Sequence, residues 1–345
     1  LEIDPCFAEA HNNEGVILTD FFRLLEAQKS YKKAIGLKPD YAEAHNNLAV
    51  TLQELGHLTN SEASFRKAIS LKPDYAEAHS NLGLLLLAAG HYAEAAVNFS
   101  SSNFENSKYY LLRCLYLQNK RSLFYDQLEN LLDHGDIHPM IGSLSCRAAL
   151  RYGDERPNLF CKDPLDYVLK TDLSNQYDFQ KIFIETAKAI LSENKVINKR
   201  QDLLFNGYQT SGNLFSLEPN LTADIQKIIR LEITKYQVNF KNSTEGLITN
   251  WPATYDLYGW LVSMKSGGEL KPHMHEKGWI SGSIYINVPA KSRTESGNLV
   301  VCIEDEGLVR ENKNQEKSID VVTGSLCLFP ASLLHYTIPF ESNEE

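Results

Sequence analysis

The feature that most constrains the fold is an internal repeat that fills about the first 102 residues. The heptapeptides FAEAHNN, YAEAHNN and YAEAHSN start at Phe7, Tyr41 and Tyr75, at a constant step of 34 residues. Self-similarity at a fixed period of this size is typical of stacked units, each of which buries its apolar face against its neighbours. Apolar residues within each unit follow helical spacing. We therefore predict an α-helical solenoid at the N-terminus.

This period, with two helices per unit, resembles the tetratricopeptide repeat. The second unit carries the small and large residues of that family's pattern at Leu48, Ala49, Leu52, Gly56, Ser61, Phe65, Ala68 and Pro73. The first unit departs from the pattern, because Glu14 replaces a leucine and Phe22 replaces the glycine of the turn. We therefore expect an irregular first helix. The opening LEIDP resembles the tail of a preceding unit, so we also expect another repeat upstream.

Polar side chains recur on the first helix of each unit. Repeats of this kind form a concave surface that binds peptide segments. We predict that an extended peptide contacts His45, Asn46, His79 and Asn81. The alternative is that these residues are a solvated face of a pure scaffold. The predicted partner is therefore a protein or a peptide.

The remainder of the chain changes character at about residues 104 and 201. Helical spacing continues without the repeat at 109–117, 123–132, 141–152 and 174–191. From residue 201, turn residues separate short apolar runs at 256–265, 280–288, 298–304 and near Val321 and Leu326, with one helix at 222–240. Many short strands between turns indicate a sandwich or jelly roll. The predicted fold is multidomain α plus β, with repeats in 1–103, a helical continuation or connector in 104–200 and a β domain in 201–345.

Three histidines in the β domain have the spacing of a metal site. His273 and His275 are two residues apart, so both imidazoles project from one face of an extended strand, whereas Glu276 points the other way. His335 follows a glycine turn and an apolar strand, 62 residues after His273. A close pair with a distant third ligand is the layout of mononuclear non-haem iron sites, which use two histidines and a carboxylate. We predict a metal bound by His273, His275 and His335; the alternative is three unrelated structural histidines.

An ordered set of motifs around these histidines resembles the 2-oxoglutarate/Fe(II)-dependent oxygenases, which often follow tetratricopeptide repeats. The set runs from QTSGNLF at 209–215 through HMH at 273–275 and SGSIY at 281–285 to the segment at 324–335 that holds Gly324, Phe329-Pro330 and His335. The resemblance covers residues 201–345. It implies a double-stranded β-helix, Fe(II) on the three histidines, and oxidation of an unactivated C–H bond with 2-oxoglutarate as cosubstrate.

Two positions relate to the cosubstrate. The IYIN strand resembles the strand of prolyl hydroxylases in which a tyrosine binds the 2-oxoglutarate carboxylate, which implies that role for Tyr285; a core aromatic is the alternative. The family usually places Arg or Lys about ten residues after the distal histidine, to pair with the outer carboxylate. After His335 the chain reads YTIPFESNEE, without a basic residue. We expect that the chain is truncated before that strand.

Composition argues against other classes of function. The net charge is −10 without a dense run of Lys or Arg, so no nucleic-acid partner is predicted. No apolar run approaches the length that spans a bilayer, so no membrane partner is predicted either. The six cysteines are scattered without a CxxC pair, which indicates a reducing compartment. We predict a cytoplasmic protein, although a chain that starts at Leu1 rather than Met leaves a targeting signal open.

The sequence therefore predicts an Fe(II)/2-oxoglutarate-dependent dioxygenase that hydroxylates a protein or peptide side chain presented by the repeats. Two alternatives stay open. One is a non-catalytic repeat scaffold with an inactive barrel, which the histidine in place of a carboxylate and the absent cation favour. The other is a three-histidine dioxygenase that does not use 2-oxoglutarate.

Overall fold

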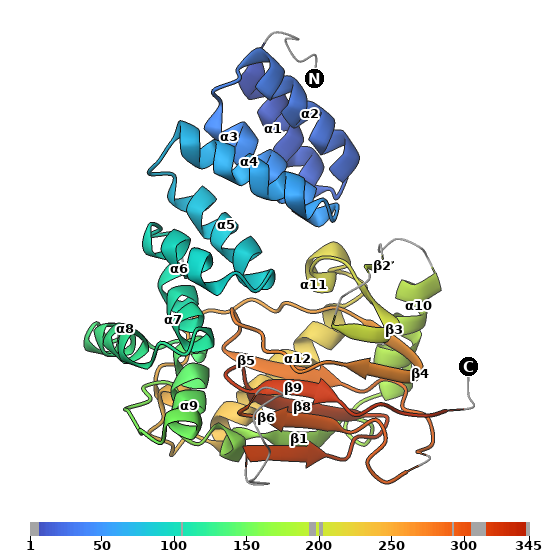
Figure 1. The fold of residues 1–345 in the computed structure, drawn as a ribbon. Coiled ribbons are helices and arrows are strands. Elements are labelled where there is room, and N and C mark those ends of the chain that lie inside the picture. The colour runs from blue at the N-terminus through green and yellow to red at the C-terminus, as the bar shows by residue number, and fades with distance from the viewer. Residues whose placement is uncertain are drawn as a thin grey trace. The chain divides into compact units, whose positions relative to one another are not determined.

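The computed structural model describes residues 7–104, 106–192, 198–199, 203–291, 293–304 and 315–342. The chain divides into two units, residues 1–130 and 131–345, and each is described by itself. Helices build the first unit, and antiparallel sheets with surrounding helices build the second (Figure 1). This arrangement confirms the predicted multidomain α plus β fold.

Helix pairs joined by short turns make up the first unit. The first helix of each pair starts at Ala8, Ala42 or Ala76, so the 34-residue step of the sequence is the step of the structure. Residues 8–100 contain helices and turns alone. The helices are α1 (Ala8–Asp20), α2 (Leu24–Leu37), α3 (Ala42–Glu54), α4 (Leu58–Leu71), α5 (Ala76–Ala88), α6 (Tyr92–Ser100), α7 (Ser107–Leu117) and α8 (Arg121–Asp133), which crosses the division between the units.

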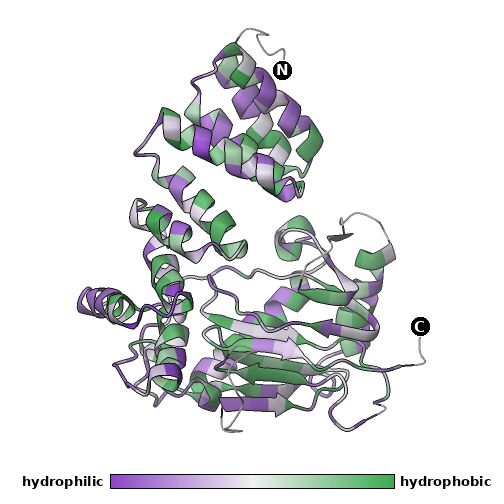
Figure 2. Cartoon of the chain, in the orientation of Figure 1, coloured by the Kyte–Doolittle hydropathy of each residue, from purple (hydrophilic) through white to green (hydrophobic). Residues whose placement is uncertain are grey.

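Glycines on the first helices let an aromatic ring of the second helix pack against the backbone. A Cβ atom on Gly15 would lie 2.5 Å from Cε1 of Tyr31, and one on Gly83 would lie 2.7 Å from Cε1 of Phe99. Both rings are almost completely buried. Figure 2 shows hydrophobic and hydrophilic residues alternating along these helices, as expected for helices that bury one face. The close approach of helix and ring therefore helps to hold the α1/α2 and α5/α6 pairs together.

The first repeat is regular, so the prediction of an irregular first helix is wrong. α1 has 13 residues, as α3 and α5 do. Phe22 takes the left-handed conformation with φ +56°, at the step where Gly56 has φ +79° and Gly90 has φ +80°. The turn keeps its geometry at the cost of a bulky residue at positive φ, which is sterically unfavourable. The LEIDP segment that resembles a preceding repeat lies outside the described residues.

Helices of the second unit surround the strands. They are α9 (Pro139–Tyr152), the short 3₁₀-helix η1 (Pro164–Tyr167), the π-helical η2 (Gln180–Glu185) that continues into α10 (Thr186–Ser192), α11 (Leu214–Leu217), α12 (Ala223–Asn239) and α13 (Gly246–Thr249). α12 confirms the helix predicted at 222–240. It packs against the sheet that contains the strand at 325–330 through a shared apolar cluster (Figure 1).

The described strands form three antiparallel sheets. The first is β1 (Leu169–Asp172), β8 (Ser325–Pro330) and β5 (Ile280–Ile284), with β8 in the middle. The second is β2 (Asn198–Lys199), β3 (Leu204–Thr210) and β4 (Val262–Leu270). The third is β7 (Glu316–Ile319), β6 (Leu299–Cys302) and β9 (Leu334–Thr337). An isolated bridge between His273 and His335 links the segment after β4 to β9, so the second and third sheets meet there.

β8 is the centre of the core, because it is buried on both faces. Leu326 and Leu328 belong to the apolar cluster that includes α12, whereas Cys327 and Phe329 belong to the cluster that includes β6. A strand covered on both faces has a continuous apolar sequence, here SLCLFP. Figure 2 shows this concentration of hydrophobic residues on the strands. The residues of β8 thus separate a helix-covered side from an interior between sheets.

Three segments differ from the sequence prediction. β1 lies in the region predicted to be a helical connector, and it pairs with β8 from the far end of the chain. Residues 174–178 are not helical, because the Asp172 carboxylate accepts hydrogen bonds from Ser174 and Asn175 and fixes a turn. The strand predicted at 256–265 begins only at Val262. In each case a contact made by side chains or by distant backbone outweighs local spacing.

Candidate metal centre

The candidate site is built on a main-chain pairing between two histidines that are far apart in sequence. The His273 N–H donates to the His335 carbonyl at 3.1 Å, and the His335 N–H donates to the His273 carbonyl at 2.8 Å. His335 lies in β9, where it is the register partner of Val301 in β6. The backbone therefore fixes the separation of these two side chains.

His275 supplies a third imidazole from the extended segment after β4. One ring nitrogen from each of His273, His275 and His335 lies within 4.8 Å of the other two. The ring centroids are 4.2 Å apart for His273 and His335, 4.9 Å for His275 and His335, and 5.1 Å for His273 and His275. Within the described part of the chain, these three form the only group of His, Cys, Asp and Glu close enough to hold a metal ion, and Glu276 is not part of it.

A hydrogen bond determines which nitrogen of His273 is free. Nδ1 of His273 lies 2.8 Å from the carbonyl oxygen of Lys271. Because a carbonyl oxygen only accepts, Nδ1 carries the proton and donates it. The lone pair then resides on Nε2, which is the arrangement that orients ligating histidines in metal proteins.

The three imidazoles are neutral at pH 7. Burial lowers the pKa of His273 below its usual value. Burial, and then the neighbouring His273, lower the pKa of His275 to about 4. Burial, followed by the proximity of both other histidines, holds the pKa of His335 well below its usual range. Neutral imidazole is the form that binds metal ions.

This set of donors fits a divalent transition metal. Nδ1 of His335 is buried, and it meets no hydrogen-bond partner in the described part of the chain. Leaving a buried polar atom unsatisfied costs about 1–3 kcal/mol, which a metal ion or an ordered water would remove. Imidazole suits iron, zinc, copper and nickel. Three nitrogens therefore indicate a transition metal without selecting one.

Two aromatic rings flank the histidines, and neither was assigned a role at the site from the sequence. The Trp260 ring lies 5.1 Å from the His275 ring at an interplanar angle of 69°, and the Phe329 ring lies 5.0 Å from the His335 ring. Alternation along β8 could have identified Phe329, because it shares a face with Cys327 in the interior. Trp260 precedes β4 in a segment without regular structure. No periodic signal marks it.

Ser281 in β5 and Tyr285, the residue directly after β5, lie on the interior side of this sheet. Tyr285 packs at the edge of the cluster that contains Cys327 and Phe329, and burial, with a smaller effect of Cys327, raises the pKa of its phenol. Ser281 is the register partner of Phe329 and is 6% exposed. Its hydroxyl is buried without a hydrogen-bond partner among the described residues. The role of Tyr285 toward a cosubstrate stays a prediction.

The asparagines predicted to contact a peptide form hydrogen bonds between repeats. Nδ2 of Asn81 donates to Oδ1 of Asn46 at 3.1 Å, and Nδ2 of Asn47 donates to Oδ1 of Asn12 at 3.1 Å. The same bond thus recurs between successive first helices. Asn46 has no exposed surface, so its amide acts within the stack of helices.

The histidines of the same motif contact the turns between repeats. Nε2 of His45 lies 3.1 Å from the carbonyl oxygen of Pro39, and Nε2 of His79 lies 3.0 Å from that of Pro73. Nδ1 of His79 also lies 3.0 Å from Oδ1 of Asn98. These contacts give the two histidines a structural role, and peptide binding by them stays a prediction.

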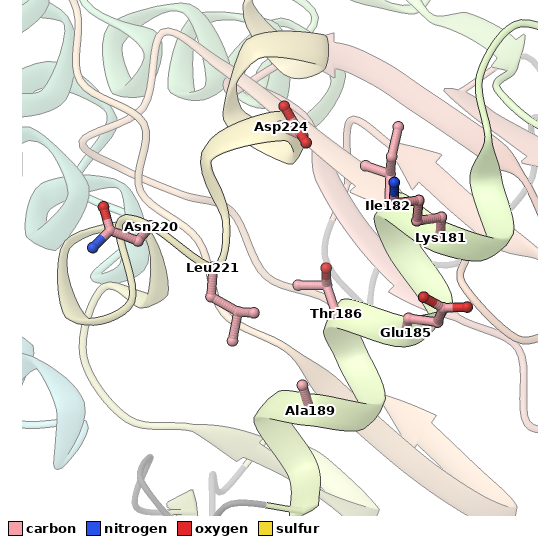
Figure 3. Close-up of a pocket in the computed structure, with 8 residues that line it drawn as sticks. All are labelled: Lys181, Ile182, Glu185, Thr186, Ala189, Asn220, Leu221 and Asp224. Carbon is pink, nitrogen blue, oxygen red and sulfur yellow. The ribbon is translucent and has the colours of Figure 1, made fainter.

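Figure 3 shows a pocket in the same unit, with a volume of about 350 Å³. Lys181 and Glu185 lie on the wall made by η2, and Asp224 lies on the opposite wall at the start of α12 (Figure 3). None of the three candidate ligands lines it. Its walls carry charges of both signs. The histidine cluster therefore remains the candidate site.

Among the helices in the described ranges, none combines the length and the apolarity that crossing a bilayer requires.

Several solved structures are similar to the chain. Among them are the crystal structure of MamA (21% identity, covering 38% of this chain and 79% of that chain, TM-score 0.36) and the structure of Pseudomonas aeruginosa pilF (24% identity, 45% and 72%, TM-score 0.40). The first TPR of Spaghetti (RPAP3), bound to an HSP90 peptide, is a third (19% identity, 34% and 99%, TM-score 0.32). All three TM-scores are below 0.5, so no argument about this chain rests on them. No curated protein matches the chain.

Two family models match the chain, and they match different parts of it. Residues 23–56 and 54–90 match the TPR repeat, in the region where the helix pairs repeat every 34 residues. Residues 258–345 match the family described as "Putative 2OG-Fe(II) oxygenase". That match includes His273, His275 and His335. The chain therefore combines tetratricopeptide repeats with a C-terminal domain of this oxygenase family.

Proposed function

We propose that this chain is an Fe(II)- and 2-oxoglutarate-dependent dioxygenase that hydroxylates a side chain of a protein or peptide. One observation carries the proposal: three neutral, buried or half-buried imidazoles converge inside the segment that matches the oxygenase family. In this proposal residues 1–103 recruit the substrate, residues 104–200 connect, and residues 201–345 form a double-stranded β-helix to which β1 adds a strand.

The ligands in this proposal are His273, His275 and His335. When bound, iron and 2-oxoglutarate together supply the insertion of one oxygen atom of O₂ into a C–H bond, with succinate and CO₂ as coproducts. The protein's residues hold and shield this centre. Lys271 fixes the tautomer of His273 through its carbonyl, and Phe329 covers the ring of His335 against water.

The interior of the sheets supplies neutral hydrogen-bond donors for a cosubstrate carboxylate. Tyr285 is the donor implied by the family resemblance. Ser281 is a second candidate, because its buried hydroxyl is unpartnered among the described residues and it lies opposite Phe329 in the sheet. Lys265 and Lys271 flank the histidine segment but are exposed. Binding of the carboxylate is therefore assigned to hydroxyl groups.

The protein or peptide substrate is inferred from the repeats. Stacked helix pairs present an extended concave surface, which is suited to a chain segment rather than to a small molecule. The net charge of −10 favours a basic partner over an acidic one.

Succinate release tests the proposal. The purified chain is loaded anaerobically with Fe(II) and 2-oxoglutarate, and O₂ is then admitted without substrate, so that uncoupled turnover reports the chemistry. We expect succinate and CO₂ in equal amounts, and their absence in the His273→Ala variant. Activity toward another substrate without any succinate would support a three-histidine dioxygenase, which the third histidine in place of a carboxylate favours. Absence of both metal binding and succinate would support the scaffold.

A further inference from the structure

The motif QTSGNLF at 209–215 has no part in the site described so far, although it belongs to the family resemblance. In the structure it holds the segment 257–261. The Asn213 side chain donates from Nδ2 to the carbonyl of Leu257 at 3.0 Å and accepts at Oδ1 from the Gly259 N–H at 3.1 Å. The Leu214 N–H donates to the carbonyl of Gly259 at 2.8 Å.

The same segment is held at its other end by Thr210. Its hydroxyl accepts from the Leu261 N–H at 3.0 Å, and its N–H donates to the Leu261 carbonyl at 3.0 Å. Main-chain groups of the alternate residues 257, 259 and 261 are thus all bonded to the motif. A segment without regular secondary structure is thereby fixed along its length.

Close packing adds to these hydrogen bonds. A Cβ atom on Gly259 would lie 2.6 Å from Cε2 of Phe215, the last residue of the motif. Glycine is therefore required where the segment crosses this ring. The residue that follows is Trp260, whose ring meets the His275 ring at 5.1 Å.

The orientation of the His275 imidazole depends more on its ring contact with Trp260 than the orientation of His273 or His335 depends on any ring contact. His273 is oriented by the Lys271 carbonyl, and His335 is fixed within β9. In the described part of the chain, the imidazole of His275 has ring contacts alone: Trp260, His273 and His335. Removal of the indole would leave the other two imidazoles as its ring neighbours.

We propose that Trp260 is a positioning residue that sets the orientation of His275, and that the 209–215 motif acts through it by fixing the segment 257–261. The inference rests on the metal centre of the proposed function. It assigns the motif to metal binding, although no residue of the motif is a ligand.

Affinity for Co(II), a redox-stable probe, tests this role. Binding is measured by calorimetry, and the visible absorption of bound Co(II) reports the ligand set. Loss of an outer residue that orients a ligand typically lowers metal affinity about 10- to 100-fold. We expect a loss in this range for Trp260→Ala and for Asn213→Ala, recovery to near the native value for Trp260→Phe, and an unchanged affinity for the control Phe205→Ala, an exposed aromatic outside the segment. Trp260→Leu provides the measurement if Trp260→Ala does not fold.

A double-mutant cycle separates positioning from a general structural effect. In the His275→Ala background, Trp260→Ala should cause no further loss of Co(II) affinity. The His275→Ala single variant and the His275→Ala/Trp260→Ala double variant should therefore have the same Co(II) spectrum. Additive losses, or native affinity in Trp260→Ala and Trp260→Leu, would overturn the inference. If His273→Ala and His335→Ala also bind Co(II) with native affinity, the assignment of the three histidines as the metal centre is wrong. That result would overturn the proposed function rather than the positioning role of Trp260 alone.

Discussion

At the scale of single residues, the three histidines are held in different ways. His273 and His335 share a main-chain pairing, whereas His275 is held by ring contacts. The H-x-H spacing and the distal histidine were enough to predict which residues meet, because alternation along an extended segment is a local property. The tautomer of His273 and the contact with Trp260 could not be predicted. Both depend on where carbonyls and loops lie after folding.

Ligand substitutions should separate the histidines from the adjacent carboxylate. We expect His273→Ala or His335→Ala to abolish Fe(II) binding, because two imidazoles remain and the main-chain pair no longer carries two ligands. Glu276→Ala should leave affinity nearly intact. Anaerobic calorimetry with Fe(II) measures both. A chain in which Glu276 is essential and His275 is dispensable would show that the ligand assignment is wrong.

The lowered pKa of His275 has a consequence for stability in the metal-free protein. Between the usual value near 6.5 and the folded value of about 4, an unfolded chain binds a proton on this residue that the folded chain does not. Stability therefore falls as pH falls through this window, by at most about 1.4 kcal/mol per pH unit for one group. Below pH 4 both states are protonated and the effect ends.

The His275→Gln variant isolates this contribution, since it lacks the titrating group. We expect the unfolding free energy of the native chain, relative to that of the variant, to decrease as the pH falls from 6.5 to 4. Urea unfolding followed by tryptophan fluorescence measures it, because Trp251, Trp260 and Trp279 all lie in the second unit. Parallel pH profiles for the two proteins would contradict the assignment.

At the scale of elements, periodic helices were predictable and irregular segments were not. The repeats, α12 and the strand at 325–330 follow from spacing alone. β1 could not be predicted from spacing, because its sequence LKTD carries one large apolar residue. This strand owes its structure to pairing with β8. The turn at 172–175 likewise replaced the start of the helix predicted at 174–191, through side-chain hydrogen bonds of Asp172, whereas the later part of that segment is helical in η2 and α10. Competition between local spacing and such contacts is decided only in the folded chain.

Two glycines of the repeats should respond to the same substitution with opposite signs. Gly83→Ala places a Cβ 2.7 Å from Phe99, so we expect destabilisation by about 1–3 kcal/mol from overpacking. Gly36 lies in α2 with no atom within 4 Å of its added Cβ, so Gly36→Ala should stabilise by about 0.4–1 kcal/mol. Thermal unfolding followed by helical circular dichroism compares them. Changes of equal sign would show that the ring contact does not limit the position.

At the scale of the whole molecule, metal binding should stabilise the unit that contains the histidines. A ligand that binds the folded state alone adds about 2.7 kcal/mol at one hundred times its dissociation constant. We expect Co(II) to raise the unfolding free energy reported by tryptophan fluorescence by this amount, in a concentration-dependent manner. Slower hydrogen exchange should appear around β9 and residues 271–275. Stabilisation that persists in the His335→Ala variant would place the ion elsewhere.

The reciprocal hydrogen bonds between His273 and His335 have a further consequence for how a metal is captured. Two residues that exchange both main-chain hydrogen bonds in an antiparallel pair are held at a nearly constant Cα separation. A metal ion bound to one imidazole therefore meets the second at a high effective concentration, as in a chelate ring. The entropy of bringing these two donors together has already been lost when the chain folds. His275 then completes a site in which two donors are already close together.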